Sequence, residues 1–187
     1  QEVKVDSIEN ALLSVTHDSS KIHLHIDLFI HYLKRDINKA KFHYEKAVGL
    51  SKESGNTRWI MDAQVTKGRY FMDTGKLDSA KAIFESILPI SYELKDTGEM
   101  VYNHRLIAIV DYYQRDYLSA LKQIQLALEL AEKSGLEKKI GPLYNYLGSF
   151  YYQLGDTLNA DKYYQYAKRE YEKFDDKPRL SDVLENI

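Results

Sequence analysis

The sequence predicts an all-α fold, a solenoid built from stacked helix-turn-helix pairs. The first observation is a repeat of 40 residues, marked by Ala40, Ala80, Ala120 and Ala160. The second is that two further columns, four and seven residues after each alanine, share its helical face. They are Tyr44, Phe84, Ile124 and Tyr164, and Ala47, Ile87, Ala127 and Ala167. The third is that every strong hydrophobic periodicity is that of a helix rather than a strand.

The elements follow from the phase of this repeat. We expect residues 1–20 to form an N-terminal cap segment, with a helix near 5–15. Four repeats follow, at 21–60, 61–100, 101–140 and 141–177, each with a first helix, a tight turn, a longer second helix and a loop. The first helices are expected at 21–33, 58–73, 99–113 and 142–153. The second helices are expected at 37–53, 77–95, 117–134 and 157–174. Residues 178–187 resemble the start of a further helix, so we expect the protein to continue beyond them.

Several residues mark the ends of these helices or interrupt them. Gly75 and Gly155 suit the left-handed conformation that ends a helix. Pro142 fits the first turn of its helix, where a missing N–H costs nothing. Pro89 falls inside a second helix, which we expect it to kink or break. The segment 22–28 alternates like a strand, but the repeat phase favours a helix there.

The composition is typical of a soluble, folded protein. Of 187 residues, 44% are hydrophobic and 29% are charged, and the formal net charge is −2. No basic surplus points to nucleic acid or to an anionic membrane. No segment is apolar and long enough to span a bilayer, so we expect no direct membrane insertion. Cysteine is absent, which removes thiol catalysis, thiolate metal sites and disulfides.

Catalytic and metal-binding motifs are missing. His23 and His25 are two residues apart and point to different sides of a helix, so they cannot share a metal. His43 is isolated in the sequence. The chain contains no glycine-rich phosphate loop, no nucleophile elbow and no zinc-protease motif. We therefore expect no enzyme activity, no cofactor and no metal.

A column of small residues, Gly68, Ala108 and Gly148, marks where the first helix of a repeat packs close to its neighbour. Together with the other columns it resembles the tetratricopeptide repeat (TPR) family in a 40-residue form. The fourth repeat matches the family pattern best, through Tyr144, Leu147, Gly148, Tyr151, Gly155, Ala160, Tyr164 and Ala167. The resemblance implies a right-handed superhelical scaffold that binds a protein or peptide in its concave groove.

The resemblance also suggests a setting for the chain. Its opening segment is similar to those that precede the repeats of bacterial membrane-anchored signalling proteins. That similarity favours the sensory or interaction region of a larger bacterial signal-transduction protein, in an extracytoplasmic (periplasmic) region, with the cytoplasm as the alternative. The alternative function is a peptide-responsive regulator of a downstream DNA-binding or output domain.

One flank of the first helices is rich in residues favoured at binding surfaces, among the 16 tyrosines of the chain. The resemblance implies that this flank lines the concave groove. The candidate groove residues are Tyr32, Asp62, Arg69, Met72, Tyr102, Arg105, Tyr112, Asn145, Ser149 and Tyr152. Tyr32, Met72, Tyr112 and Tyr152 form one column of the repeat. The alternative is that these rings only pack between adjacent helices, because amphipathic rings suit either role.

Overall fold

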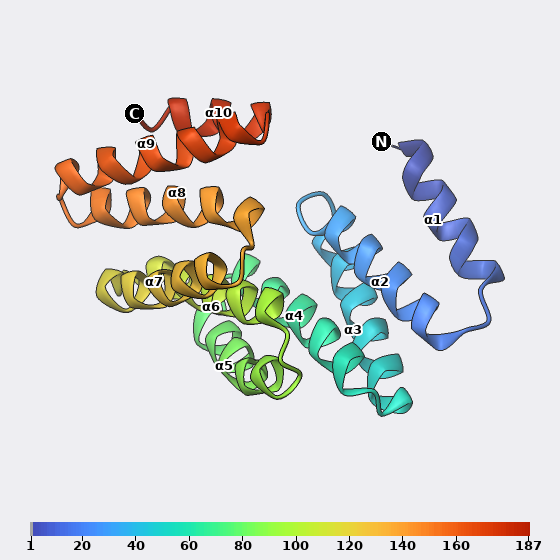
Figure 1. Cartoon of the computed structure of the whole chain (residues 1–187). Helices are drawn as coiled ribbons and strands as arrows, with labels where there is room; N and C mark the ends of the chain where they lie inside the picture. The colour runs from blue at the N-terminus through green and yellow to red at the C-terminus, as the bar shows by residue number, and fades with distance from the viewer. Residues whose placement is uncertain (1) are drawn as a thin grey trace. The chain divides into compact units, whose positions relative to one another are not determined.

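The structure is a computed structural model that describes residues 2–187, with side chains from Val5 onward, and these residues form ten helices and no strand (Figure 1). This confirms the all-α prediction. The helices are α1 Glu2–Ser14, α2 Asp18–Tyr32, α3 Ile37–Ser54, α4 Thr57–Asp73, α5 Leu77–Glu93, α6 Thr97–Tyr113, α7 Tyr117–Lys133, α8 Glu137–Gln153, α9 Thr157–Lys173 and α10 Lys177–Leu184.

The chain divides into two compact units, residues 1–90 and 91–187, with the division inside α5. In the first unit α1 packs on α2, α2 packs on α3, and α4 contacts both α2 and α3. In the second unit α6 to α10 each pack on the next helix along the chain. Every candidate site below lies within one of these units.

The helices are more regular than the sequence reading predicted. Each of the six helices from α4 to α9 has 17 residues, and a three-residue turn separates each from the next. A residue with positive φ stands in each turn at 20-residue intervals: Gly55, Gly75, Lys95, Arg115, Gly135, Gly155 and Asp175. The expectation of longer second helices, and of loops rather than tight turns between repeats, is therefore wrong for α4 to α9. In the first repeat the second helix is longer, since α3 has 18 residues and α2 has 15.

Asn56 and Asp96 cap α4 and α6, which begin one and two residues earlier than expected, whereas α2 and α8 also begin earlier but have no side-chain cap. The side chain of Asn56 accepts a hydrogen bond from the backbone N–H of Trp59, and Asp96 accepts one from Glu99. Asp116 and Asp156 cap the second helices of their pairs in the same way. Each bond satisfies an N–H that the first turn of a helix leaves unpaired, so the helix starts directly after its cap.

Pro89 and Pro142 both lie inside continuous helices. Pro142 is the sixth residue of α8 rather than part of its first turn, because α8 begins at Glu137. α5 runs unbroken past Pro89 to Glu93, so the expected break does not occur. A proline removes one backbone hydrogen bond, and the turns on either side of it keep the helix continuous. The alternating segment 22–28 is helical, as the repeat phase predicted.

The repeated alanines and glycines are packing residues, as predicted. Ala40, Ala80, Ala120 and Ala160 are all at most 2% exposed. A Cβ atom built on Gly68 would lie 2.4 Å from the Phe84 ring, and one on Gly148 would lie 2.5 Å from the Tyr164 ring. Glycine is therefore required where a ring of the following helix fills the joint. In the α6–α7 pair the matching residues are Ala108 and Ile124, and both are fully buried.

Candidate ligand-binding groove

Three adjoining cavities lie between the first helices of the second unit and its last helix. Their volumes are about 330, 170 and 190 Å³, and Pro142 and Arg179 line all three. The smallest lies between α6 and α8, and the largest lies between α8 and the junction of α9 with α10. We call this continuous depression the α8 groove.

The repeat places matching positions of successive first helices along this groove. Tyr102 of α6, Pro142 of α8 and Asp182 of α10 are 40 residues apart, and each lines a cavity. Lys139 and Arg179 form a second such pair, again 40 residues apart. The same repeat that builds the core thus sets which side chains face the groove.

The side of the groove between α6 and α8 is basic and aromatic. The Arg105 guanidinium lies over the Tyr102 ring, 4.9 Å from its centroid. Lys139 Nζ donates a hydrogen bond to the Gly98 carbonyl at 3.0 Å. Neither Arg105 nor Lys138 forms an ion pair with any residue that the structure describes. Two cations on this side are therefore available to an anionic group.

The centre of the groove contains an unsatisfied acceptor. Asn145 Oδ1 is buried and has no hydrogen-bond partner among the described side chains and backbone. Its neighbour Ser149 is already engaged, because Ser149 Oγ donates to the Asn145 carbonyl and accepts from the Tyr164 hydroxyl. A buried acceptor without a donor costs about 1–3 kcal/mol, which a ligand N–H at this point would recover.

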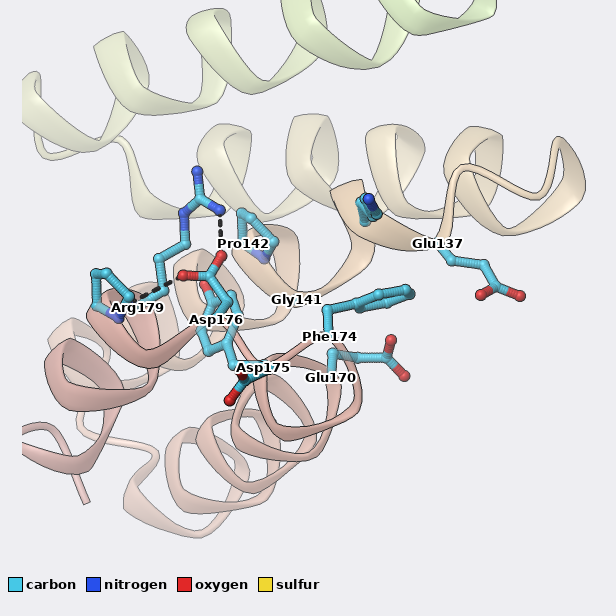
Figure 2. Close-up of a pocket in the computed structure, with 11 residues that line it drawn as sticks. Glu137, Gly141, Pro142, Glu170, Phe174, Asp175, Asp176 and Arg179 are labelled. Atoms are coloured by element: carbon cyan, nitrogen blue, oxygen red, sulfur yellow. Dashed lines mark hydrogen bonds and ion pairs between the residues drawn. The ribbon is translucent and has the colours of Figure 1, made fainter.

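The opposite side, between α8 and α9, is acidic. Four carboxyl groups, together with Lys138 and Arg179, line the cavity of about 330 Å³: Glu137, Glu170, Asp175 and Asp176. Lys173 pairs with Glu137 at 3.0 Å, and Arg179 pairs with Asp176. In Figure 2 the Asp176–Arg179 pair lies on one side of the cavity, and Glu170 lies with Phe174 on the other. Burial raises the pKa of Tyr171, which lines the same cavity, so its phenol stays neutral.

The structure brings together three of the predicted groove residues, Tyr102, Arg105 and Asn145, at cavities of the second unit. Tyr112 packs instead against α8, with its ring stacked on Phe150 at 5.1 Å. Tyr152 is 60% exposed and lines none of these cavities. The predicted column of rings is therefore not one uniform surface within this unit.

The predicted residues of the first unit have structural partners. Tyr32 is only 9% exposed, and its hydroxyl donates to Glu9 Oε1 at 2.8 Å, so this ring packs between helices, which is the alternative given for the column. α1 covers this ring, which the sequence did not reveal. Asp62 pairs with Arg58 at 3.4 Å, and Arg69 lies over the Phe29 ring. Met72 is partly buried.

Sequence reasoning missed several residues of the α8 groove. They are Lys138, Lys139, Tyr146, Glu170, Arg179 and Asp182. The repeat could have predicted two of them, because Arg179 and Asp182 of α10 lie 40 residues after Lys139 and Pro142, which line the groove from α8. Glu170 gave no such signal, since it belongs to a second helix and reaches the groove from α9.

A pair of buried histidines was also missed, in the first unit. His25 Nδ1 and His43 Nδ1 are 2.9 Å apart, although the two residues lie on different helices. Burial, together with the nearby His43 and Lys46, lowers the pKa of His25 from 6.5 to about 4. Burial also lowers the pKa of His43. The pair therefore shares a hydrogen bond between neutral rings at neutral pH.

The described residues contain no group of three or more side chains that could hold a metal ion. Within the same part of the chain, no helix combines the length and apolar character needed to cross a membrane.

Comparison with known proteins identifies the architecture. No protein-family model matches the chain. The chain is similar to tetratricopeptide repeat protein 29 of Trypanosoma brucei brucei, with 26% identity over 152 residues, which are 74% of this chain and 30% of that protein. The chain thus spans about a third of the length of this curated relative.

Three solved structures show the same fold. A Rap protein complexed with Competence and Sporulation Factor gives a TM-score of 0.88 at 14% identity, over 96% of this chain and 51% of that one. Bacillus thuringiensis PlcR, in complex with a peptide and DNA, gives 0.84 at 16% identity, over 96% and 66%. A STAND protein with a TPR sensor from Pyrococcus horikoshii gives 0.81 at 17% identity, over 99% and 30%. The chain therefore has the fold of TPR proteins.

Proposed function

We propose that this chain is a non-catalytic scaffold that binds a peptide, or an extended segment of a protein, in the α8 groove. The observation that carries the proposal is the groove itself, where unpaired cations, aromatic side chains and an unsatisfied buried acceptor converge within one unit. Aromatic rings, Arg and Asn are the residue types that bind peptides by combining contact area with hydrogen bonds.

The dimensions of the groove suit a short extended peptide. Neighbouring helices pack 8–10 Å apart, so the path from α6 across α8 to α10 is about 20 Å long. An extended chain advances about 3.3 Å per residue, so about six residues would cover it. Asn145 Oδ1, at the centre of this path, would accept a backbone N–H of the peptide.

Two of the similar solved structures support a peptide ligand. The Rap protein was solved with Competence and Sporulation Factor, and PlcR was solved with a peptide and DNA. We propose that this chain likewise serves as the sensory or interaction region of a larger signal-transduction protein. The PlcR complex also favours a second candidate, a peptide-responsive regulator of a DNA-binding or other output domain.

A peptide selection tests the binding function. Randomised heptapeptides, displayed with flanking residues at both ends, would be selected against the immobilised full chain, and binding would be measured by fluorescence anisotropy. We expect enriched peptides to lose about tenfold in affinity, or 1.4 kcal/mol, with Arg105→Glu. Arg169→Glu is the matched control, because Arg169 is exposed on α9 and lines no groove cavity.

Two results would overturn the proposal. One is a selection that enriches no peptide above an unrelated immobilised protein. The other is a set of binders that Arg105→Glu and Arg169→Glu weaken equally, because binding would then not take place in the α8 groove.

A further inference from the structure

We infer that the α8 groove is divided by charge and selects a bipolar peptide, with an acidic side chain between α6 and α8 and a basic side chain between α8 and α9. This inference rests on the proposed function and specifies the class of ligand. Two unpaired charges carry it, Arg105 in the cavity between α6 and α8 and Glu170 in the cavity between α8 and α9, while the unpaired cation Lys138 lines both cavities.

Ion pairs neutralise three of the four carboxylates on the acidic side and leave one without a cationic partner. Lys173 pairs with Glu137, Arg179 with Asp176, and Lys177 lies 3.8 Å from Asp175. The carboxylate of Glu170 makes no hydrogen bond or ion pair within the described residues, and its Oε2 is buried. Only Glu170, among the four, lacks a cation of its own.

The surroundings of Glu170 suit the side chain of a lysine or arginine. The rings of Phe174 and Tyr171 line the same cavity of about 330 Å³. Aromatic faces attract cations and also cover the aliphatic stem of a long basic side chain. A buried carboxylate oxygen without a donor favours a ligand that brings one. The cavity thus combines volume, two aromatic rings and a carboxylate oxygen without a hydrogen-bond donor.

The basic side offers the opposite arrangement. Arg105 and Lys138 line the cavity between α6 and α8 and have no anionic partner in the described part of the chain. Asp182 is the one acidic residue that lines the adjoining cavity with Arg105, and Arg179 lines that cavity too. Cations remain in excess on this side, so an Asp or Glu of the ligand would be favoured there.

The two sides are one helix apart. At a spacing of 8–10 Å between neighbouring helices, the centres of the two cavities are bridged by about three residues of extended peptide. The expected ligand therefore has an acidic residue and a basic residue three or four positions apart. A peptide with charge of one sign only would satisfy one side and oppose the other.

The test repeats the heptapeptide selection against the wild-type chain and the Glu170→Lys variant and compares the charges of the enriched peptides. We expect the wild-type pool to pair an acidic with a basic residue three or four positions away. The Glu170→Lys pool should keep the acidic residue and lose the basic one. A wild-type binder whose basic residue is changed to Glu should bind Glu170→Lys about tenfold more tightly than the wild-type chain.

Glu172→Lys is the matched control, because Glu172 is exposed on the same helix and lines no cavity of the groove. Its pool should match that of the wild type. Enrichment of basic residues by both wild type and Glu170→Lys would overturn the charge division while leaving the binding function intact. A failure to enrich any peptide would overturn the proposed function and this inference together. Thermal melts monitored by circular dichroism establish that both variants are folded.

Discussion

Tyr32 and Tyr152 occupy the same position of the repeat, three repeats apart, and their environments are opposite. The Tyr32 ring is 9% exposed, stacks on His43 at 5.7 Å, and donates its hydroxyl to Glu9. The Tyr152 ring is 60% exposed. The repeat position fixes where the side chain leaves the helix, but the element that covers it decides whether the ring packs or meets solvent.

The cover over Tyr32 is α1. Its apolar residues Val5, Ile8 and Leu12 belong to the same hydrophobic cluster as Tyr32. In the second unit, Tyr112 shows an intermediate case, because its ring stacks on Phe150 of α8. A column of tyrosines at one position of a repeat is therefore not by itself evidence for a continuous binding surface.

Removal of the Tyr32 ring should produce the largest effect. Tyr32→Ala would leave a cavity under α1 and remove the partner of Glu9, and we expect a loss of about 4 kcal/mol in unfolding free energy. Trp59, the only tryptophan, lies on α4 in the first unit, so its fluorescence during urea unfolding reports on this region. Tyr152→Ala, monitored by circular dichroism, should cost less than about 0.5 kcal/mol. Similar losses in the two variants would contradict the contrast between the two positions.

Acid should destabilise the first unit through the histidine pair. Because the pKa of His25 is lowered to about 4 in the folded state, the unfolded chain binds a proton first as the pH falls below 6.5. The stability is therefore complete above pH 6.5 and decreases toward pH 4, by about 3 kcal/mol for this group. Trp59 fluorescence in urea at each pH measures the decrease.

The His25→Leu variant should flatten this pH dependence relative to the wild-type chain. His23→Leu is the control, since His23 is exposed and its Nδ1 contacts only the Ser19 carbonyl of the same helix. An unchanged acid slope in His25→Leu would show that the buried pair does not govern the acid response.

The alanine column should behave alike in both units, unlike the tyrosine column. Ala40 and Ala160 are both at most 2% exposed, so Ala40→Leu and Ala160→Leu should each overpack a helix joint, at about 2 kcal/mol. Lys162→Leu, an exposed substitution on α9, is the control. Denaturant midpoints that shift equally little for Ala160→Leu and Lys162→Leu would refute the close-packing assignment.

Tyr112→Ala should give the smallest of the four effects, because the Tyr112 ring is only partly buried. We expect a loss of about 1.5 kcal/mol, from its stacked contact with Phe150. Tyr112→Phe keeps the ring and should leave the thermal melting temperature nearly unchanged. A loss in Tyr112→Ala no larger than that in Tyr152→Ala would place both rings outside the packed structure.

The sequence by itself determined the fold class, the repeat length and the residues of the core. Alanine and glycine columns at a fixed period specify helices that pack closely, because larger side chains at Gly148 or Ala160 would collide with the next helix. The starts of six helices were also encoded, in the caps Asp36, Asn56, Asp96, Asp116, Asp156 and Asp176, whereas Lys76 and Leu136 occupy the same position before α5 and α8.

Only the tertiary structure decided which surface residues are accessible and which charges are unpaired. Tyr32 and Tyr152 cannot be told apart by their place in the repeat, since burial by α1 depends on contacts between distant segments. The same holds for the His25–His43 pair, and for Glu170, which α9 brings to the cavity beside α8. Periodicity reports on one helix face, whereas a binding site depends on side chains that several helices bring together.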